Sequence, residues 1–162
     1  MTATTTHETR IDADPALPTI RITRDFDAPP DRVFRAWTDP DLVVRWLGPD
    51  ETTMRLDAWD ARTGGSYRYV ALRGEEEIAR FYGSFHEVRP SERLVQTFTY
   101  EGYPDGVSLD TMTFEDLGDG RTRVVALSVV DTMEARDAII ASGMETGVLE
   151  GYAKLDAVLA EG

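Results

Sequence analysis

The fold of this protein is decided by residues 143–160, which read GMETGVLEGYAKLDAVLA. Apolar residues recur here, and just before, at steps of three and four, which is the spacing of one face of an α-helix. That face holds Ile140, Met144, Val148, Tyr152, Leu155 and Leu159. We therefore predict a long helix from about residue 143 to residue 160, preceded by a short helix that begins near Asp131.

A second stripe on the same helix holds Gly143, Gly147 and Gly151. A glycine inside a helix costs about 1 kcal/mol relative to alanine, so three glycines in register need a reason. Either another backbone comes close to them, or the space beside the helix is left unfilled. We interpret the helix as a lid over a curved sheet, with its glycine face bordering a cavity.

Two sequence patterns mark where these helices begin. Asp131 with Glu134, and Ser142 with Glu145, have the spacing of a capping box, in which two side chains bond to free backbone N–H groups. The second box predicts a break or bend between the two helices, near residues 142–143.

The middle of the chain predicts a sheet. Between residues 52 and 131, alternating apolar and polar residues are separated by turn signals, of which Asp119-Gly120 is a strong hairpin signal. Successive strands joined by short turns must be antiparallel. We predict seven strands, at residues 19–26, 53–59, 64–72, 78–88, 94–100, 107–117 and 122–130.

Two short helices are predicted between the first two strands. The first begins at Pro29-Pro30 and presents an apolar face around Trp37. The second begins at Asp39-Pro40 and ends at Gly48-Pro49. Trp46, in the second helix, could stack on a ligand, but a tryptophan at such a position more often packs the helices against the sheet.

Arg24 falls on the apolar side of the strand at 19–26. We interpret this strand as an edge strand whose arginine reaches solvent, and a charge that points into a cavity is the alternative. Residues 1–18 show no period and end in DPALP at 14–18. We predict a mobile tail at 1–18 and a single domain at 19–162.

Composition limits which binding partners and which cellular compartment are expected for this protein. The 162 residues suit one domain, and 17 Lys and Arg against 30 Asp and Glu give a net charge of −13. A surface this acidic repels phosphate, so nucleic acid is not an expected partner. No apolar run approaches the roughly 20 residues of a membrane span, and the first ten residues lack the apolar segment of a secretory signal. We therefore expect a cytoplasmic protein.

Few residues offer catalytic chemistry. There are no cysteines, and of the two histidines His7 lies in the predicted tail, so any nucleophile would need His86 as its base. His86 lies in the strand at 78–88, where the alternation does not decide which face points inward, and such a histidine is more often a surface residue. The chain has no H-x-x-x-H or cysteine pair and no phosphate loop. We assign no catalytic residue, metal or cofactor.

The aromatic residues suggest a binding site instead. Apolar walls with a few hydroxyl groups are the usual composition of a small-molecule site, and Tyr100, Met112 and Tyr152 suit a guest best. Most of the other aromatic residues are expected to be ordinary core. The candidate ligand-binding residues are Trp37, Trp46, Tyr67, Tyr69, Phe85, Phe98, Tyr100, Met112, Phe114, Met144, Gly147, Val148, Gly151 and Tyr152.

Several short segments occur in a specific order. The chain carries FDAPP at 26–30, VFRAW at 33–37, RWLGP at 45–49 and DARTGGSY at 60–67, with shorter matches at 83–90, 92–95 and 143–145. Their order and spacing resemble the family of bacterial homologues of the heat-shock-chaperone ATPase activator, over about residues 19–159. The resemblance implies an α+β helix-grip fold (START-like, similar to the birch-pollen allergen), in which a curved antiparallel sheet wraps a C-terminal helix around a cavity for lipids, polyketides or other apolar molecules.

Three functions follow from the residues and the resemblance together. The leading hypothesis is the binding of a small hydrophobic molecule between the sheet and the C-terminal helix. The alternative is a cyclase- or dehydratase-type enzyme that uses His86, Arg24 and Tyr100 in the same cavity. A chaperone-interacting protein is the weakest hypothesis, because we expect no separate docking domain of the kind that eukaryotic activators carry. Besides the small apolar molecule, two partners stay open: a second copy of the chain and a chaperone.

Overall fold

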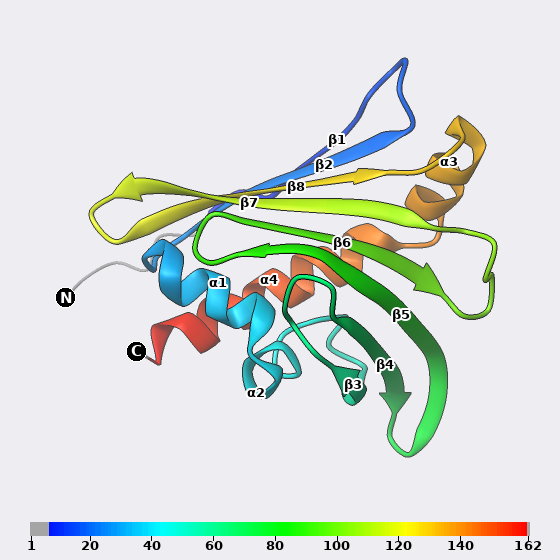
Figure 1. The fold of residues 1–162 in the computed structure, drawn as a ribbon, viewed down its shortest axis with the longest axis horizontal. Coiled ribbons are helices and arrows are strands. Elements are labelled where there is room, and N and C mark those ends of the chain that lie inside the picture. The colour runs from blue at the N-terminus through cyan, green and yellow to red at the C-terminus, as the bar shows by residue number, and fades with distance from the viewer. Residues whose placement is uncertain (1–6, 162) are drawn as a thin grey trace.

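The computed structural model describes residues 7–161, which form one antiparallel sheet with helices against one of its faces (Figure 1). The helices α1, α2 and α4 lie on that face, and α3 lies at the end of the sheet near β8. Among the described residues, no helix is long and apolar enough to cross a membrane. In chain order the elements are β1 (Arg10–Ala13), β2 (Thr19–Phe26), α1 (Pro30–Thr38), α2 (Pro40–Val43), β3 (Thr53–Trp59), β4 (Ser66–Arg73), β5 (Glu76–Arg89), β6 (Arg93–Tyr100), β7 (Ser108–Gly118), β8 (Arg121–Val129), α3 (Met133–Ala141) and α4 (Met144–Ala160).

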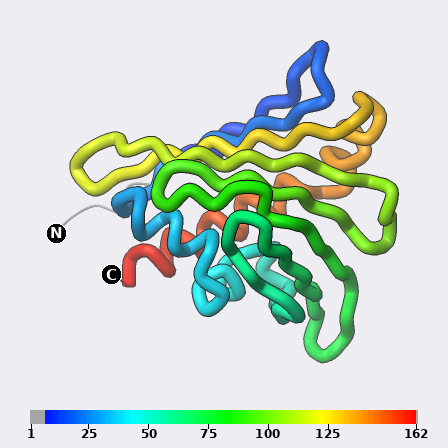
Figure 2. Tube along the Cα trace, in the orientation of Figure 1, coloured from blue at the N-terminus to red at the C-terminus, as the bar shows by residue number. Residues whose placement is uncertain are grey.

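The sheet has the strand order β1-β2-β8-β7-β6-β5-β4-β3. The six strands from β3 to β8 each pair with the next along the chain, as short turns require, and β2 returns to pair with β8. Extra residues in β3, β5 and β7 bend these strands, because a bulge adds a residue to one side of a pair. β4 and β5 curl towards the helical side, so the face that carries the helices is concave (Figure 2).

All seven predicted strands are present, with ends within two residues of the predicted ones, but an eighth strand was missed. β1 lies in the segment predicted as a mobile tail and pairs with β2, from Arg10 opposite Thr23 to Ala13 opposite Ile20. Arg136 of α3 holds the turn that follows, donating to the backbone oxygens of Asp14, Leu17 and Thr19. β1 and this turn are held by contacts to the backbone, so the alternation of side chains in the sequence could not predict them. Residues 1–6 of the predicted tail lie outside the described residues.

The two C-terminal helices break where predicted, but their caps differ from the prediction. Thr132, not Asp131, caps α3 by accepting a hydrogen bond from the Ala135 N–H at 3.0 Å. At the start of α4, the residue in the cap position is Gly143 in a left-handed conformation, with φ of 89°, and no side chain caps the helix. Ser142 donates back to the carbonyl of Ile139 instead, so the predicted second capping box is wrong.

The core lies between the sheet and the C-terminal half of α4. Tyr152, Leu155 and Leu159 are buried there, whereas Met144 and Val148 are only partly buried and Ile140 is 39% exposed. The predicted apolar face of the helix is therefore correct, but only its second half is packed tightly. This unequal packing of α4 determines where a site can be.

Candidate functional site

The predicted ligand-binding aromatic residues, together with four others (Phe26, Phe34, Trp59 and Phe81), form two networks of ring contacts on the concave face. The first group, here called the core cluster, surrounds α1 and the end of α4 and consists of Phe26, Phe34, Trp37, Trp46, Phe114 and Tyr152. The second, here called the aromatic row, crosses strands β3 to β6 and consists of Trp59, Tyr67, Tyr69, Phe81, Phe85, Phe98 and Tyr100.

The core cluster is ordinary packing. Trp37 lies at its centre, with ring centroids 4.7 Å from Trp46 and 5.6 Å from Phe114. The Trp46 indole N–H donates to the Ala36 carbonyl at 2.8 Å, so its polar atom is satisfied as in a tryptophan that joins helices to a sheet. Met112, another predicted ligand residue, is also buried in this core. We assign these residues to stability.

The aromatic row changes from buried to exposed along the sheet. Phe85, Tyr67 and Tyr69 are 1–8% exposed, Phe81 and Phe98 are partly exposed, and Tyr100 is 46% exposed. Neighbouring rings stack across the strands, with centroids 5.0 Å apart for Tyr69 and Phe81 and 5.2 Å apart for Phe81 and Phe98. The row thus presents an aromatic wall whose outer end reaches solvent, where a shallow hollow of about 330 Å³ borders Tyr100.

Partly buried residues of α4 belong to the same concave face. Met144 and Val148 pack against the core without being enclosed by it. Here we call Phe81, Phe98, Tyr100, Met144 and Val148 the open inner face, because these apolar side chains lie on the concave side and still reach solvent.

The glycine stripe of α4 does not border this face. A Cβ atom on Gly151 would lie 3.0 Å from the backbone oxygen of Trp46, and one on Gly147 would lie 3.7 Å from the Pro49 ring. Gly143 serves the left-handed turn before the helix. The stripe therefore faces residues 46–49, and its interpretation as the border of a cavity is wrong. Close approach of another backbone explains Gly151 instead.

This placement predicts opposite effects for two alanine substitutions. Gly147→Ala is expected to raise the free energy of unfolding by about 0.5–1 kcal/mol, because alanine favours the helix and its methyl group meets only Pro49 at van der Waals distance. Gly151→Ala is expected to lower it by about 1 kcal/mol, because crowding of the Trp46 carbonyl outweighs the helix propensity. Urea denaturation followed by circular dichroism measures both, and equal effects would contradict the assigned contacts.

A polar group that the sequence analysis missed lies on the concave face of β6, β7 and β8. Asp110 is paired in register with Gln96 of β6 and Ser128 of β8. The Ser108 hydroxyl donates to the Asp110 carboxylate at 2.5 Å, and the Ser128 side chain hydrogen-bonds to the same carboxylate. Burial raises the pKa of Asp110 above its ordinary value, against the opposing effect of these two serines. The Asp110 carboxylate is thus partly buried on the concave face, on the same side of β7 as the buried Met112 and Phe114.

The aromatic row reaches this polar group. The Tyr67 hydroxyl donates to the Thr97 carbonyl at 2.6 Å and lies 3.4 Å from the Gln96 amide nitrogen. Burial raises the pKa of Tyr69, and the negative charge of Asp110 raises it further. The buried end of the aromatic row therefore lies next to this polar group.

Arg24 is buried, which corrects the prediction that it reaches solvent from an edge strand. β1 covers the edge of β2, and Arg24 is 5% exposed. Its guanidinium group bonds to both carboxylate oxygens of Asp156 in α4, at 2.6 and 3.0 Å, and lies over the ring of Phe26. It therefore joins α4 to the sheet.

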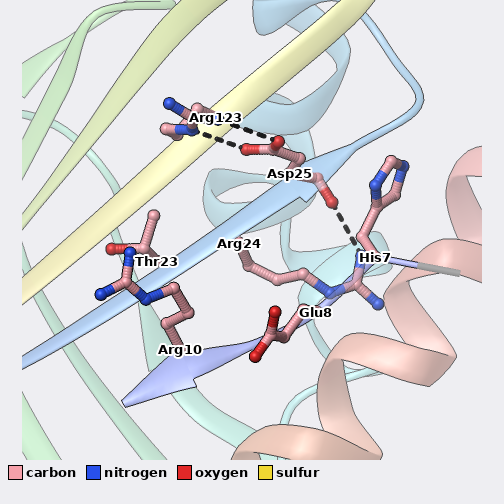
Figure 3. A pocket seen from close by; sticks show the side chains of 7 residues that line it. All are labelled: His7, Glu8, Arg10, Thr23, Arg24, Asp25 and Arg123. Atoms are coloured by element: carbon pink, nitrogen blue, oxygen red, sulfur yellow. Dashed lines mark hydrogen bonds and ion pairs between the residues drawn. The ribbon is translucent and has the colours of Figure 1, made fainter. Parts of the chain in front are cut away.

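A hollow of about 270 Å³ beside Arg24 is lined by charged residues (Figure 3). Arg123 is paired with Asp25, and Arg24 donates to the Asp25 carbonyl, as the dashed lines in Figure 3 mark. His7, which the sequence places in an inert tail, bonds to Asp27 at 2.8 Å. Arg24, Arg123 and His7 already have partners, so we do not assign an anion site here.

The residues named for an enzyme do not come together. His86 is exposed, because Phe85 next to it points into the core and strand side chains alternate. Arg24 is bonded to Asp156, and Tyr100 lies at the exposed end of the aromatic row. The face of the strand that carries His86, which the alternation had left undecided, is thus the outer one.

Comparison with known proteins places the chain in a family. The model of the family described as Activator of Hsp90 ATPase homolog 1-like protein matches residues 27–160. The chain belongs to this family. The match covers the core cluster except Phe26, the whole aromatic row and Asp110, and it confirms the resemblance carried by the sequence motifs. No match is found among curated proteins.

Solved bacterial structures share the fold of this chain. A Rhodobacter sphaeroides protein is 29% identical, with a TM-score of 0.86, over 95% of this chain and 99% of that one. A Chromobacterium violaceum protein is 30% identical, with a TM-score of 0.75, over 87% and 96%. An HSP90 activator from Plasmodium falciparum, 18% identical over 68% and 71% with a TM-score of 0.51, shares the fold alone. The helix-grip fold is confirmed, with eight strands in place of seven.

Proposed function

We propose that this protein binds a small hydrophobic molecule on the open inner face, between the aromatic row and the first half of α4. The observation that carries the proposal is the unequal packing of the concave face. The second half of α4 is buried against the core cluster, whereas Met144 and Val148 in its first half and the outer rings of the aromatic row keep part of their exposure. Exposed apolar surface that is grouped on a concave face is typical of ligand sites.

The helix-grip fold supports the proposal, because it places a concave sheet face opposite a helix. The side chains between the sheet and the helix then determine what can bind there. In this chain those side chains are mostly aromatic. Aromatic rings bury large areas and stack on flat molecules, so ring-containing ligands fit this wall better than flexible chains do.

The proposal predicts that filling the open inner face abolishes binding. Val148→Trp is expected to weaken binding of the neutral fluorescent probe N-phenyl-1-naphthylamine by about tenfold or more, because the larger indole occupies space at a partly exposed position of the open inner face. Fluorescence titration of the purified protein measures the dissociation constant. Thermal unfolding of the same sample checks that the fold is retained.

Leu149→Trp is the matched control. Leu149 is the next residue of α4, is 44% exposed and belongs to the solvent side of the helix, so the same side chain placed there is expected to leave binding unchanged. Equal binding by the wild type and Val148→Trp would remove the open inner face as the site. Failure of the wild type to bind the probe would count against hydrophobic binding itself.

A chaperone contact is a second, weaker proposal, supported by the description of the family that the chain matches. Measurement of the Hsp90 ATPase rate with and without the purified protein tests it. A rate that does not change at saturating protein would exclude activation. The cyclase-type alternative is not proposed, because its three candidate side chains do not meet.

A further inference from the structure

The concave face carries one carboxylate within an apolar site. Asp110 lies on the same face of β7 as Met112 and Phe114, both of which are buried in the core. Its neighbours in register, Gln96 and Ser128, are partly exposed, as is Asp110 itself. A group on the open inner face can therefore reach this carboxylate without opening the core.

The hydrogen bonds around Asp110 use the carboxylate as an acceptor. Ser108 and Ser128 both bond to it through their side chains, and a hydroxyl that bonds to an ionised carboxylate must be the donor. A carboxylate has about four acceptor positions, so two serines leave positions for a ligand. The Tyr67 hydroxyl does not fill one of them, since it donates to the Thr97 carbonyl.

We propose that Asp110 binds the protonated amine of a ligand whose apolar ring system stacks on the aromatic row. This inference rests on the proposed function and names the class of ligand, an aromatic or alicyclic amine. The cation would pair with a carboxylate that is only partly solvated, which is where a charge-assisted hydrogen bond is strongest.

Three further observations favour a cation over a neutral or anionic ligand. The faces of aromatic rings attract cations, and the rings of Tyr67, Tyr69 and Phe98 belong to the row beside Asp110. The net charge of −13 attracts cations to the protein at long range. The raised pKa of Asp110 shows that its charge is poorly compensated in the free protein, and a bound cation would supply the compensation.

Competition between ligands of similar shape tests the inference. Displacement of N-phenyl-1-naphthylamine is measured with 2-(1-naphthyl)ethylamine, 2-(1-naphthyl)ethanol and 1-naphthylacetic acid, which differ mainly in their polar group. The amine is expected to bind about tenfold more tightly than the alcohol, and the acid most weakly. In Asp110→Asn, which keeps the size of the side chain, the preference for the amine is expected to disappear while the alcohol binds as before.

Glu115→Gln is the control for net charge, because it removes one negative charge from an exposed position of the same strand. It is expected to keep the preference for the amine. Equal binding of amine and alcohol by the wild type, or a preference that survives in Asp110→Asn, would overturn the role of Asp110 while leaving the proposed function intact. If the fluorescent probe N-phenyl-1-naphthylamine does not bind to the wild type at all, the proposed function fails, and the inference fails with it. Because the comparison of ligands on the wild type needs no variant, the test holds even where Asp110→Asn does not fold.

Discussion

Trp37→Ala is expected to lower the free energy of unfolding by about 3–5 kcal/mol. The Trp37 ring contacts four other aromatic rings, those of Phe26, Trp46, Phe114 and Tyr152, which come from the sheet and from two other segments. Removal of the indole leaves a cavity at the point where α1, the sheet and α4 meet. Urea denaturation followed by far-ultraviolet circular dichroism measures the loss without relying on tryptophan fluorescence.

Tyr100→Ala provides the comparison, because Tyr100 is aromatic and on the concave face but 46% exposed. Its removal is expected to cost less than about 1 kcal/mol, as for most exposed positions. A loss for Trp37→Ala no larger than that for Tyr100→Ala would show that the core cluster does not hold the fold together. The division of the aromatic residues into core and site would then have to be abandoned.

The strands were predictable because alternation is a local signal. A two-residue period identifies which side chains share a face, and it placed Phe98 with Tyr100 and Met112 with Phe114. It does not indicate how deep each pair lies, because depth depends on the helix that covers that part of the strand. The sequence therefore combined the core cluster and the aromatic row into one set of ligand residues.

β1 and Arg24 were misjudged for one common reason. β1 has only Ile11 as a large apolar residue and is held by backbone hydrogen bonds to β2. Without β1, the strand at 19–26 looked like an edge strand, and an arginine on its apolar side was assigned to solvent. The sequence could not identify the partner of Arg24, because the chain has 30 acidic residues and Asp156 is 132 positions away from Arg24.

Asp110 was missed although a signal was present. It lies two residues before Met112 on the same face of the strand, so the predicted inward direction of Met112 also applied to Asp110. Its residue type alone does not single it out, because the chain has 30 acidic residues. The glycine stripe shows the converse limit: the spacing of Gly147 and Gly151 identifies a side of the helix, but only the tertiary structure shows that residues 46–49 lie against it.

Asp156→Ala is expected to lower the free energy of unfolding by about 3 kcal/mol, because it leaves the buried Arg24 guanidinium group without its anionic partner. Arg24 is 5% exposed and keeps only the Asp25 carbonyl as a hydrogen-bond partner, since its Nε atom has none. The value lies at the lower end of the range for broken buried pairs, because the Asp156 side chain is 42% exposed and water can enter where it was removed.

Two further variants distinguish the effect of the unpaired Arg24 charge from a general loss of stability in α4. Glu161→Ala breaks the exposed pair with Arg45 just after the same helix and is expected to cost less than about 1 kcal/mol. Adding Arg24→Met to Asp156→Ala is expected to recover most of the lost stability, because an apolar side chain of similar length removes the unpaired charge. If the double variant is no more stable than Asp156→Ala alone, the loss comes from the helix and not from Arg24. Recovery would instead assign the loss to the unpaired charge of Arg24, which is buried between β2 and α4 and therefore needs an anionic partner.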